Sequence, residues 1–201
     1  MFEKPRAPKD YFRLQRISQI TDSHCGPAVL QMLLSNLDIP ATQEDIAQAA
    51  GVTDVIEIHG TRVDQLAQAV HTLAPEVQFW YKDHATLDDL TALVSEHGYP
   101  VGVEWQGVFE EDNDPEPDYG HYSIVTAIEA EKRLLIMVDP YRDYVLTDRV
   151  FTLDGFDHRW WDTNMIVDAS GQSRSVKDDH MLFLVTTPLA EFPAALGMIK
   201  G

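Results

Sequence analysis

The chain has 201 residues, of which 44% are hydrophobic and 24% charged, and its formal net charge is −18. This length can bury a sizeable core, and we expect one domain over residues 1–201. The excess of carboxylates repels phosphate backbones and anionic lipid, so we expect neither nucleic acid nor a membrane as a partner. Because the N-terminus lacks the apolar run of a signal peptide, and no stretch reaches the ~20 apolar residues of a membrane span, we expect a cytoplasmic protein.

The N-terminal half, about residues 11–98, is predicted to be mainly helical and to follow a flexible arm at 1–10. A helix beginning at Cys25 should end near Leu37, since Pro27 suits a first helical turn. Three further helix starts are marked by a threonine followed three residues later by an aspartate, which is the capping-box pattern. These pairs are Thr42 with Asp45, Thr61 with Asp64, and Thr86 with Asp89.

The C-terminal half, about residues 99–190, contains short apolar runs typical of strands. Lys132 and Arg133 lie between two of these runs, which predicts a hairpin. We therefore predict an α+β fold, in which a helical half packs on an antiparallel sheet. Strands are expected at 77–81, 100–105, 121–128, 134–138, 144–150 and 181–187, loops at 106–120 and 168–179, and a short helix within 151–161 anchored by Trp160 or Trp161.

Cys25 is the single cysteine of the chain, which excludes an intrachain disulfide and a multi-cysteine metal site. We expect no cofactor and no metal. A thiol at a helix N-terminus faces unpaired N–H groups and the positive end of the helix dipole, which favours the thiolate near neutrality. Gln19, six residues upstream, can offer its amide to a developing oxyanion. The alternative is that Cys25 is a small buried hydrophobic residue of the core.

His121 is the strongest candidate partner for this thiol among the eight histidines. It opens a predicted strand, and the predicted hairpin places Asp139 at the same end of the sheet. Asp139 could accept a hydrogen bond from one imidazole nitrogen while the other nitrogen faces Cys25. The alternative for Asp139 is a turn-forming role before Pro140.

These residues resemble the papain-like cysteine peptidases, and most closely the bacteriocin-leader-processing (double-glycine leader) peptidases and their stand-alone relatives. The resemblance runs from about Gln15 to Trp161 and is carried by Gln19, Cys25-Gly26-Pro27-Ala28, Gly120-His121-Tyr122 and Val138-Asp139-Pro140. It implies a papain-like fold with Cys25 as nucleophile, His121 as general base and acid, Asp139 as its orienting group and Gln19 as oxyanion donor.

One departure from the family pattern is His24, where such sequences more often carry Asp or Asn. We interpret His24 as a solvent-facing or capping residue.

The leading hypothesis is a cysteine peptidase or amide hydrolase that acts on a peptide or protein substrate. An acyltransferase using the same site and a catalytically silent peptide-binding module remain as alternatives, and the sequence predicts no oligomeric state. The loop before His121 is either a solvated acidic face or a rim that favours basic peptides. Its carboxylates are Glu110, Glu111, Asp112, Asp114, Glu116 and Asp118.

Overall fold

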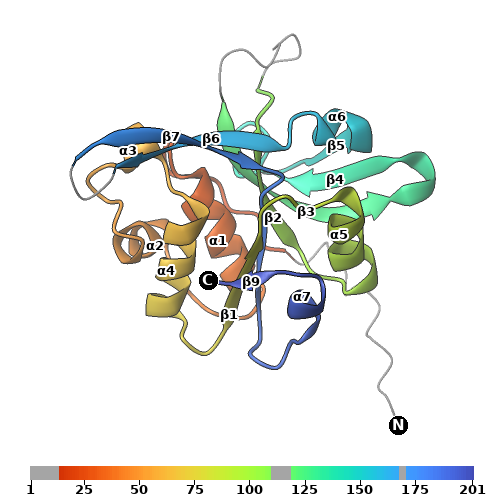
Figure 1. The fold of residues 1–201 in the computed structure, drawn as a ribbon, viewed down its shortest axis with the longest axis horizontal. Coiled ribbons are helices and arrows are strands. Elements are labelled where there is room, and N and C mark those ends of the chain that lie inside the picture. The colour runs from red at the N-terminus through yellow and green to blue at the C-terminus, as the bar shows by residue number, and fades with distance from the viewer. Residues whose placement is uncertain (1–13, 110–118, 168–170) are drawn as a thin grey trace.

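The computed structural model describes residues 14–109, 119–167 and 171–201, and within them it forms a seven-stranded antiparallel sheet (Figure 1). The strand order is β5-β4-β3-β2-β8-β1-β9, so β3 and β2 lie near the middle of the sheet. The strands are β1 (Gln78–Lys82), β2 (Val101–Gln106), β3 (Gly120–Glu129), β4 (Leu134–Val138), β5 (Asp148–Thr152), β8 (Leu182–Thr186) and β9 (Ile199–Lys200).

Helices cover both faces of this sheet, which gives the α+β fold that the sequence predicts. On one face α1, α2 and α4 enclose a core that includes Leu30, Leu66 and Phe183. On the other face a second core includes Trp105 and Trp160, and in Figure 1 α5 and α7 lie on that side. The helices are α1 (Cys25–Ser35), α2 (Gln43–Ala49), α3 (Ile56–His59), α4 (Val63–Leu73), α5 (Leu87–Thr91), α6 (Leu153–Asp157) and α7 (Phe192–Ala195).

Two of the three predicted helix caps are confirmed, and one is wrong. Thr42 and Thr86 each form a reciprocal capping box with the aspartate three residues later. Thr61 does not cap α4, because the helix begins two residues later and the Arg62 backbone N–H donates to Gln65 Oε1 at 2.9 Å. The Thr61 hydroxyl is instead buried, with no hydrogen-bond partner among the described residues.

The predicted hairpin is confirmed as the β3–β4 pair, with Ile124 opposite Val138. A register shift between Val125 and Ala127 marks a bulge in β3. The strand predicted at 144–150 begins later, as β5, because residues 142–146 form turns. The predicted short helix is α6, and Trp160 is its fully buried anchor.

The prediction of a loop at 168–179 is wrong for residues 173–179. This segment is β7 (Ser173–Asp179), which pairs with β6 (Trp161–Val167) in a separate two-stranded ribbon. Asp178 lies opposite Asp162 in that ribbon. The sequence of β7 gave no strand signal because its side chains are mostly polar, so pairing with β6 holds it rather than an apolar face of its own. Figure 1 shows the ribbon crossing above α2 and α4.

Some predictions concern residues that the structure does not describe, and one strand departs from the expected division into a helical half and a sheet half. The arm at 1–10 and the carboxylates at 110–118 are outside the described residues. β1, from the half predicted to be helical, lies within the main sheet between β8 and β9. No helix in the described part of the chain has the length and apolar character needed to cross a membrane.

Candidate active site

Cys25 is the first residue of α1, and only 8% of its surface is exposed. Its sulfur does not lie in a sealed core, because Cys25 also lines a cleft at the end of the helix. Gly26 lies where α1 packs against β3, and a Cβ at this position would be in van der Waals contact with the Tyr122 ring at 3.4 Å. The first turn of α1 therefore presents the thiol at the open end of the sheet.

His24 precedes the thiol, and our interpretation of it as a solvent-facing or capping residue is wrong. It is only 6% exposed, and its side chain makes no capping hydrogen bond. Its Nδ1 lies 2.6 Å from the Thr21 hydroxyl, which also donates to Glu57 at 2.9 Å. His24 therefore ties the segment before Cys25 to α3.

His121 and Asp139 lie side by side, as the hairpin register requires. His121 Nε2 is 2.8 Å from Asp139 Oδ1, and both side chains are almost completely buried. Burial opposes a charged imidazole and by itself would lower the pKa of His121. The charge of Asp139 and its hydrogen bond to the imidazole outweigh burial, and Cys25 acts in the same direction. The pKa of His121 is therefore raised to about 10. Since Nε2 is engaged by Asp139, Nδ1 is the nitrogen left for the sulfur.

Asp139 is also held by two further donors. Its Oδ1 accepts the Tyr141 backbone N–H at 2.9 Å, and Arg149 Nη1 donates to Oδ2 at 2.5 Å. Burial disfavours the carboxylate, but the His121 charge and hydrogen bond, together with Arg149, hold the pKa of Asp139 down at about 2. The Arg149 guanidinium itself lies over the Tyr144 ring, 4.0 Å from its centre. Asp139 therefore does more than form the turn before Pro140.

The backbone of Gln19 lies next to the segment that carries Asp139. Its N–H donates to the Pro140 carbonyl at 2.9 Å, one residue beyond Asp139. Its side-chain Nε2 donates to the Thr21 carbonyl at 2.9 Å, and its Oε1 is buried without a hydrogen-bond partner among the described residues. The amide is therefore near the predicted site, with one of its two N–H donors engaged by the Thr21 carbonyl.

The cleft beside Cys25 has a volume of about 340 Å³ and contains polar residues that sequence reasoning missed. Glu104 Oε1 accepts the Tyr122 hydroxyl at 2.7 Å and Asn164 Nδ2 at 3.0 Å. The one available signal was a glutamate within an otherwise apolar strand. The described lining residues are Asp22, Ser23, Cys25, Ile58, His59, Gly60, Thr61, Glu104, Gly120, Tyr122, Asp162, Thr163, Asn164 and Met165.

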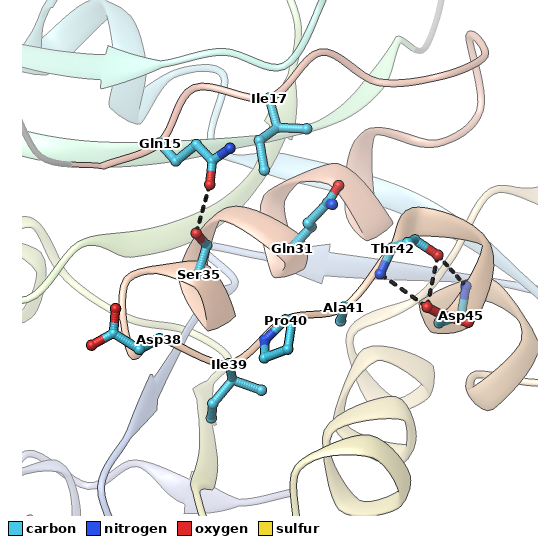
Figure 2. Close-up of a pocket in the computed structure, with 10 residues that line it drawn as sticks. All are labelled: Gln15, Ile17, Gln31, Ser35, Asp38, Ile39, Pro40, Ala41, Thr42 and Asp45. Atoms are coloured by element: carbon cyan, nitrogen blue, oxygen red, sulfur yellow. Dashed lines mark hydrogen bonds between the residues drawn. The ribbon is translucent and has the colours of Figure 1, made fainter.

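A second pocket, of about 560 Å³, lies beside the C-terminal part of α1 (Figure 2). None of the four predicted site residues lines it. Figure 2 shows its polar side chains satisfying one another, with Ser35 donating to Gln15 at 2.8 Å and Thr42 bonded to Asp45. This pocket therefore lacks the groups that the cleft at Cys25 offers.

A model of the Peptidase_C39-like family matches residues 12–164 of the chain. Solved structures similar to the chain include the peptidase domain of Streptococcus ComA, a bi-functional ABC transporter involved in a quorum-sensing pathway. The two chains share 16% sequence identity with a TM-score of 0.56, and the match covers 85% of this chain and 96% of that one. A double-glycine motif protease from an AMS/PCAT transporter, in complex with the leader peptide, has 12% identity, a TM-score of 0.55 and coverages of 90% and 94%.

The N-terminal peptidase C39-like domain of a toxin secretion ATP-binding protein from Vibrio parahaemolyticus has 11% identity, a TM-score of 0.52 and coverages of 84% and 98%. A comparison with curated proteins found no match. At these identities the structural likeness shows the fold, whereas the family match covers most of the chain.

Proposed function

The chain belongs to the Peptidase_C39-like family, and from that premise we propose that it is a cysteine peptidase with Cys25 as nucleophile and His121 as proton carrier. The observation that carries this proposal is the buried row of Asp139, His121 and Cys25, in which the 2.8 Å hydrogen bond from His121 to Asp139 directs the other imidazole nitrogen to the sulfur. A peptide is the proposed substrate, as one similar protease was solved with a leader peptide.

In the first half of the proposed reaction, the protonated His121 stabilises a thiolate on Cys25, and the sulfur attacks the scissile carbonyl carbon. The carbonyl oxygen becomes an oxyanion, for which the Gln19 amide and the Cys25 backbone N–H are the donors. One Nε2 hydrogen of Gln19 already bonds to the Thr21 carbonyl, and the second hydrogen is the one available for this oxygen. The C–N bond then breaks, and His121 gives its proton to the leaving amine.

In the second half, water attacks the thioester, and neutral His121 takes the proton from that water. The C–S bond breaks, the acid product leaves, and the thiolate and imidazolium are restored. Asp139 keeps the imidazole oriented throughout, and Arg149 keeps Asp139 ionised. Each charge that forms during the cycle therefore has a partner already in place.

The test is labelling of Cys25 with a library of peptidyl acyloxymethyl ketones, followed by intact mass measurement. We expect one adduct on the native protein and none on Cys25→Ala. His121→Ala should slow labelling by about 100-fold or more, because the sulfur loses its cationic partner. His158→Ala, which changes an exposed histidine, is the matched control and should label like the native protein.

Equal labelling rates in the native protein and in His121→Ala, with a midpoint near pH ~8.5, would indicate an ordinary thiol and favour the silent binding module. Gln19→Ala tests the oxyanion role separately. It should reduce peptide hydrolysis on the order of 10²–10³-fold while leaving the labelling of Cys25 by iodoacetamide nearly unchanged. A parallel loss of both would instead indicate a structural role for Gln19.

A further inference from the structure

The cleft at Cys25 has walls that carry an excess of carboxyl groups. Glu104 and Asp162 both line it, and Asp22 lies at its edge with Cys25. None of its described lining residues is a lysine or an arginine, and its one histidine, His59, is exposed on α3. The cleft is therefore built from acceptors and lacks a cation of its own among the described residues.

Glu104 is the most unusual of these groups, because only 1% of it is exposed. Tyr122 and Asn164 satisfy its Oε1, but Oε2 receives no hydrogen bond from the described residues. Burial and the nearby charges of Asp162 and Asp178 raise the pKa of Glu104 well above its ordinary value, although the two donors to Oε1 oppose this. Burial also raises the pKa of the neighbouring Asp178, against the opposing hydrogen bond from Asn164.

Asp162 is held in place by close packing against β3. A Cβ on Gly120 would lie 2.3 Å from Asp162 Oδ2, so the glycine is what admits this carboxylate to the end of the strand. Gln106 Nε2 donates to Asp162 Oδ1 at 3.1 Å. Because Gly120 immediately precedes His121, the Asp162 carboxylate lies one residue from the proposed proton carrier.

Thr61 adds a second unsatisfied polar atom to the same cleft. Its hydroxyl is buried and has no hydrogen-bond partner among the described residues, because Thr61 does not cap α4. Buried polar atoms are rarely left unpaired, and two in one cleft indicate that a ligand completes them. In the described part of the chain, no group of three or more His, Cys, Asp or Glu side chains has the arrangement needed to hold a metal ion.

We propose that the cleft formed by Glu104, Asp162 and Thr61 is a subsite for a positively charged group, a primary ammonium or a guanidinium, next to the scissile bond. The position next to a scissile bond rests on the proposed peptidase function, because Cys25 lines the same cleft. A volume of about 340 Å³ suits an extended aliphatic amine. The cation would pair with Glu104 Oε2 as that group loses its proton, and with Asp162.

Two sources could supply this cation, a lysine or arginine side chain and the free α-amine of a peptide. Binding to full-length Cys25→Ala distinguishes them without requiring turnover. The probes are Nα-acetyl-lysine methylamide, Nα-acetyl-norleucine methylamide and norleucine methylamide with a free α-amine. We expect one of the two cationic probes to bind about tenfold or more tightly than the acetylated norleucine probe, since hydrogen bonds to charged groups are the strong ones.

Two further variants assign this preference to the cleft. The variants are Glu104→Gln and Asp162→Asn, each made in the Cys25→Ala background. Each should bring the ratio of the affinities for the cationic and neutral probes toward one, while the affinity for the neutral probe stays unchanged. Glu131→Gln, an exposed carboxylate in the β3–β4 turn, is the matched control. The preference should persist in about 0.5 M salt, which screens the general attraction of a chain with net charge −18.

Equal affinity for all three probes would overturn the subsite, whether or not Cys25 reacts with electrophiles. A preference that survives both Glu104→Gln and Asp162→Asn would overturn it too. Should Glu104→Gln fail to fold, Asp162→Asn alone decides. A cationic preference in a protein whose Cys25 labels like a free thiol would support the subsite while rejecting the peptidase, so the two proposals fail separately.

Discussion

His121 and Tyr122 are consecutive residues of β3, but their side chains enter two polar clusters of different charge. On the face of His121, the imidazolium lies between Asp139 and Cys25, and Arg149 lies beyond Asp139. On the face of Tyr122, the hydroxyl donates to Glu104, around which further carboxyl groups gather. Successive residues of a strand point to opposite faces, so the two side chains diverge, and Cys25 at the strand end is close to both clusters.

The comparison shows which cluster is complete without a ligand. Around His121 the charges alternate, and the pKa values of His121 and Asp139 move in the directions that keep both groups ionised. Around Glu104 the neighbouring charges have the same sign, and the pKa moves in the direction that removes the charge. The first cluster has its charges balanced, which suits the proton transfer proposed for it, whereas the second lacks the cation that would complete it in the proposed subsite.

The largest effect is expected from substituting His121, which lies at the centre of the cluster with alternating charges. His121→Ala should lower peptide hydrolysis on the order of 10³-fold or more, because the leaving amine loses its proton donor. Tyr122→Phe, one residue away on the other face, should change the hydrolysis of a neutral substrate by less than about tenfold, since it removes one hydrogen bond. Steady-state rates for the two variants measure the difference, and equal losses would contradict the separation of the clusters.

Removing the outer cation should destabilise the protein strongly. Arg149→Met leaves the Asp139 carboxylate buried with one countercharge instead of two, and we expect a loss of about 3–5 kcal/mol in the free energy of unfolding. Urea unfolding measures it. The control is Arg133→Met, which breaks an exposed pair with Asp154 and should cost less than about 1 kcal/mol. A small loss for Arg149→Met would show that solvent already screens Asp139.

The same chemical change should have unequal effects in the two clusters. Asp139→Asn removes a charge that faces two cations, and we expect it to cost about 3 kcal/mol. Glu104→Gln removes a charge that burial and the neighbouring carboxylates already disfavour, so it should stay within about 1 kcal/mol of the native protein. Urea unfolding near neutral pH compares them. Similar losses for both variants would mean that Glu104 is ionised and balanced.

The smallest effect is the dependence of stability on pH, which should differ between the two clusters. The lowered pKa of Asp139 stabilises the fold above its ordinary value of 3.8, and this contribution is lost as the pH falls toward about 2. The raised pKa of His121 stabilises the fold fully below its ordinary value of 6.5, and this contribution is lost as the pH rises through about 10. Thermal unfolding should therefore show the deficit of Asp139→Asn largest between these limits.

Glu104 should behave in the opposite way to Asp139. Because its pKa is raised, the folded state retains a proton that the unfolded chain releases above its ordinary value of 4.5, and stability falls as the pH rises. Glu104→Gln should thus gain relative to the native protein with increasing pH. A constant difference across this range, in the same thermal unfolding series, would contradict the raised pKa.

Local patterns in the sequence predicted what depends on local contacts. The caps at Thr42 and Thr86 are made within four residues, and they are confirmed. The neighbouring positions of His121 and Asp139 followed from hairpin register, because a strand pair with a short turn leaves little freedom. Their roles in catalysis stay a prediction, as does that of Gln19.

The cleft carboxyls could not be predicted in this way, because they come together from separate strands. Glu104 is on β2, Asp162 on β6 and Asp178 on β7, and β7 was itself predicted to be a loop. Thr61 shows the converse error, since a correct local pattern lost to the cap formed by Arg62 and Gln65. Contacts between distant segments decided the first case, whereas a competing local cap one residue away decided the second.

The alternation of side chains between the two faces of β3 also has an evolutionary consequence. Under the proposed function, substitutions on the Tyr122 side would alter the cleft wall while His121, on the other face, keeps its contact with Asp139. An insertion or deletion of one residue between Gly120 and the bulge at Val125 would instead exchange the two faces and disturb both clusters at once. Homologues should therefore differ more at the Tyr122 position than at His121, and least in the length of this strand end.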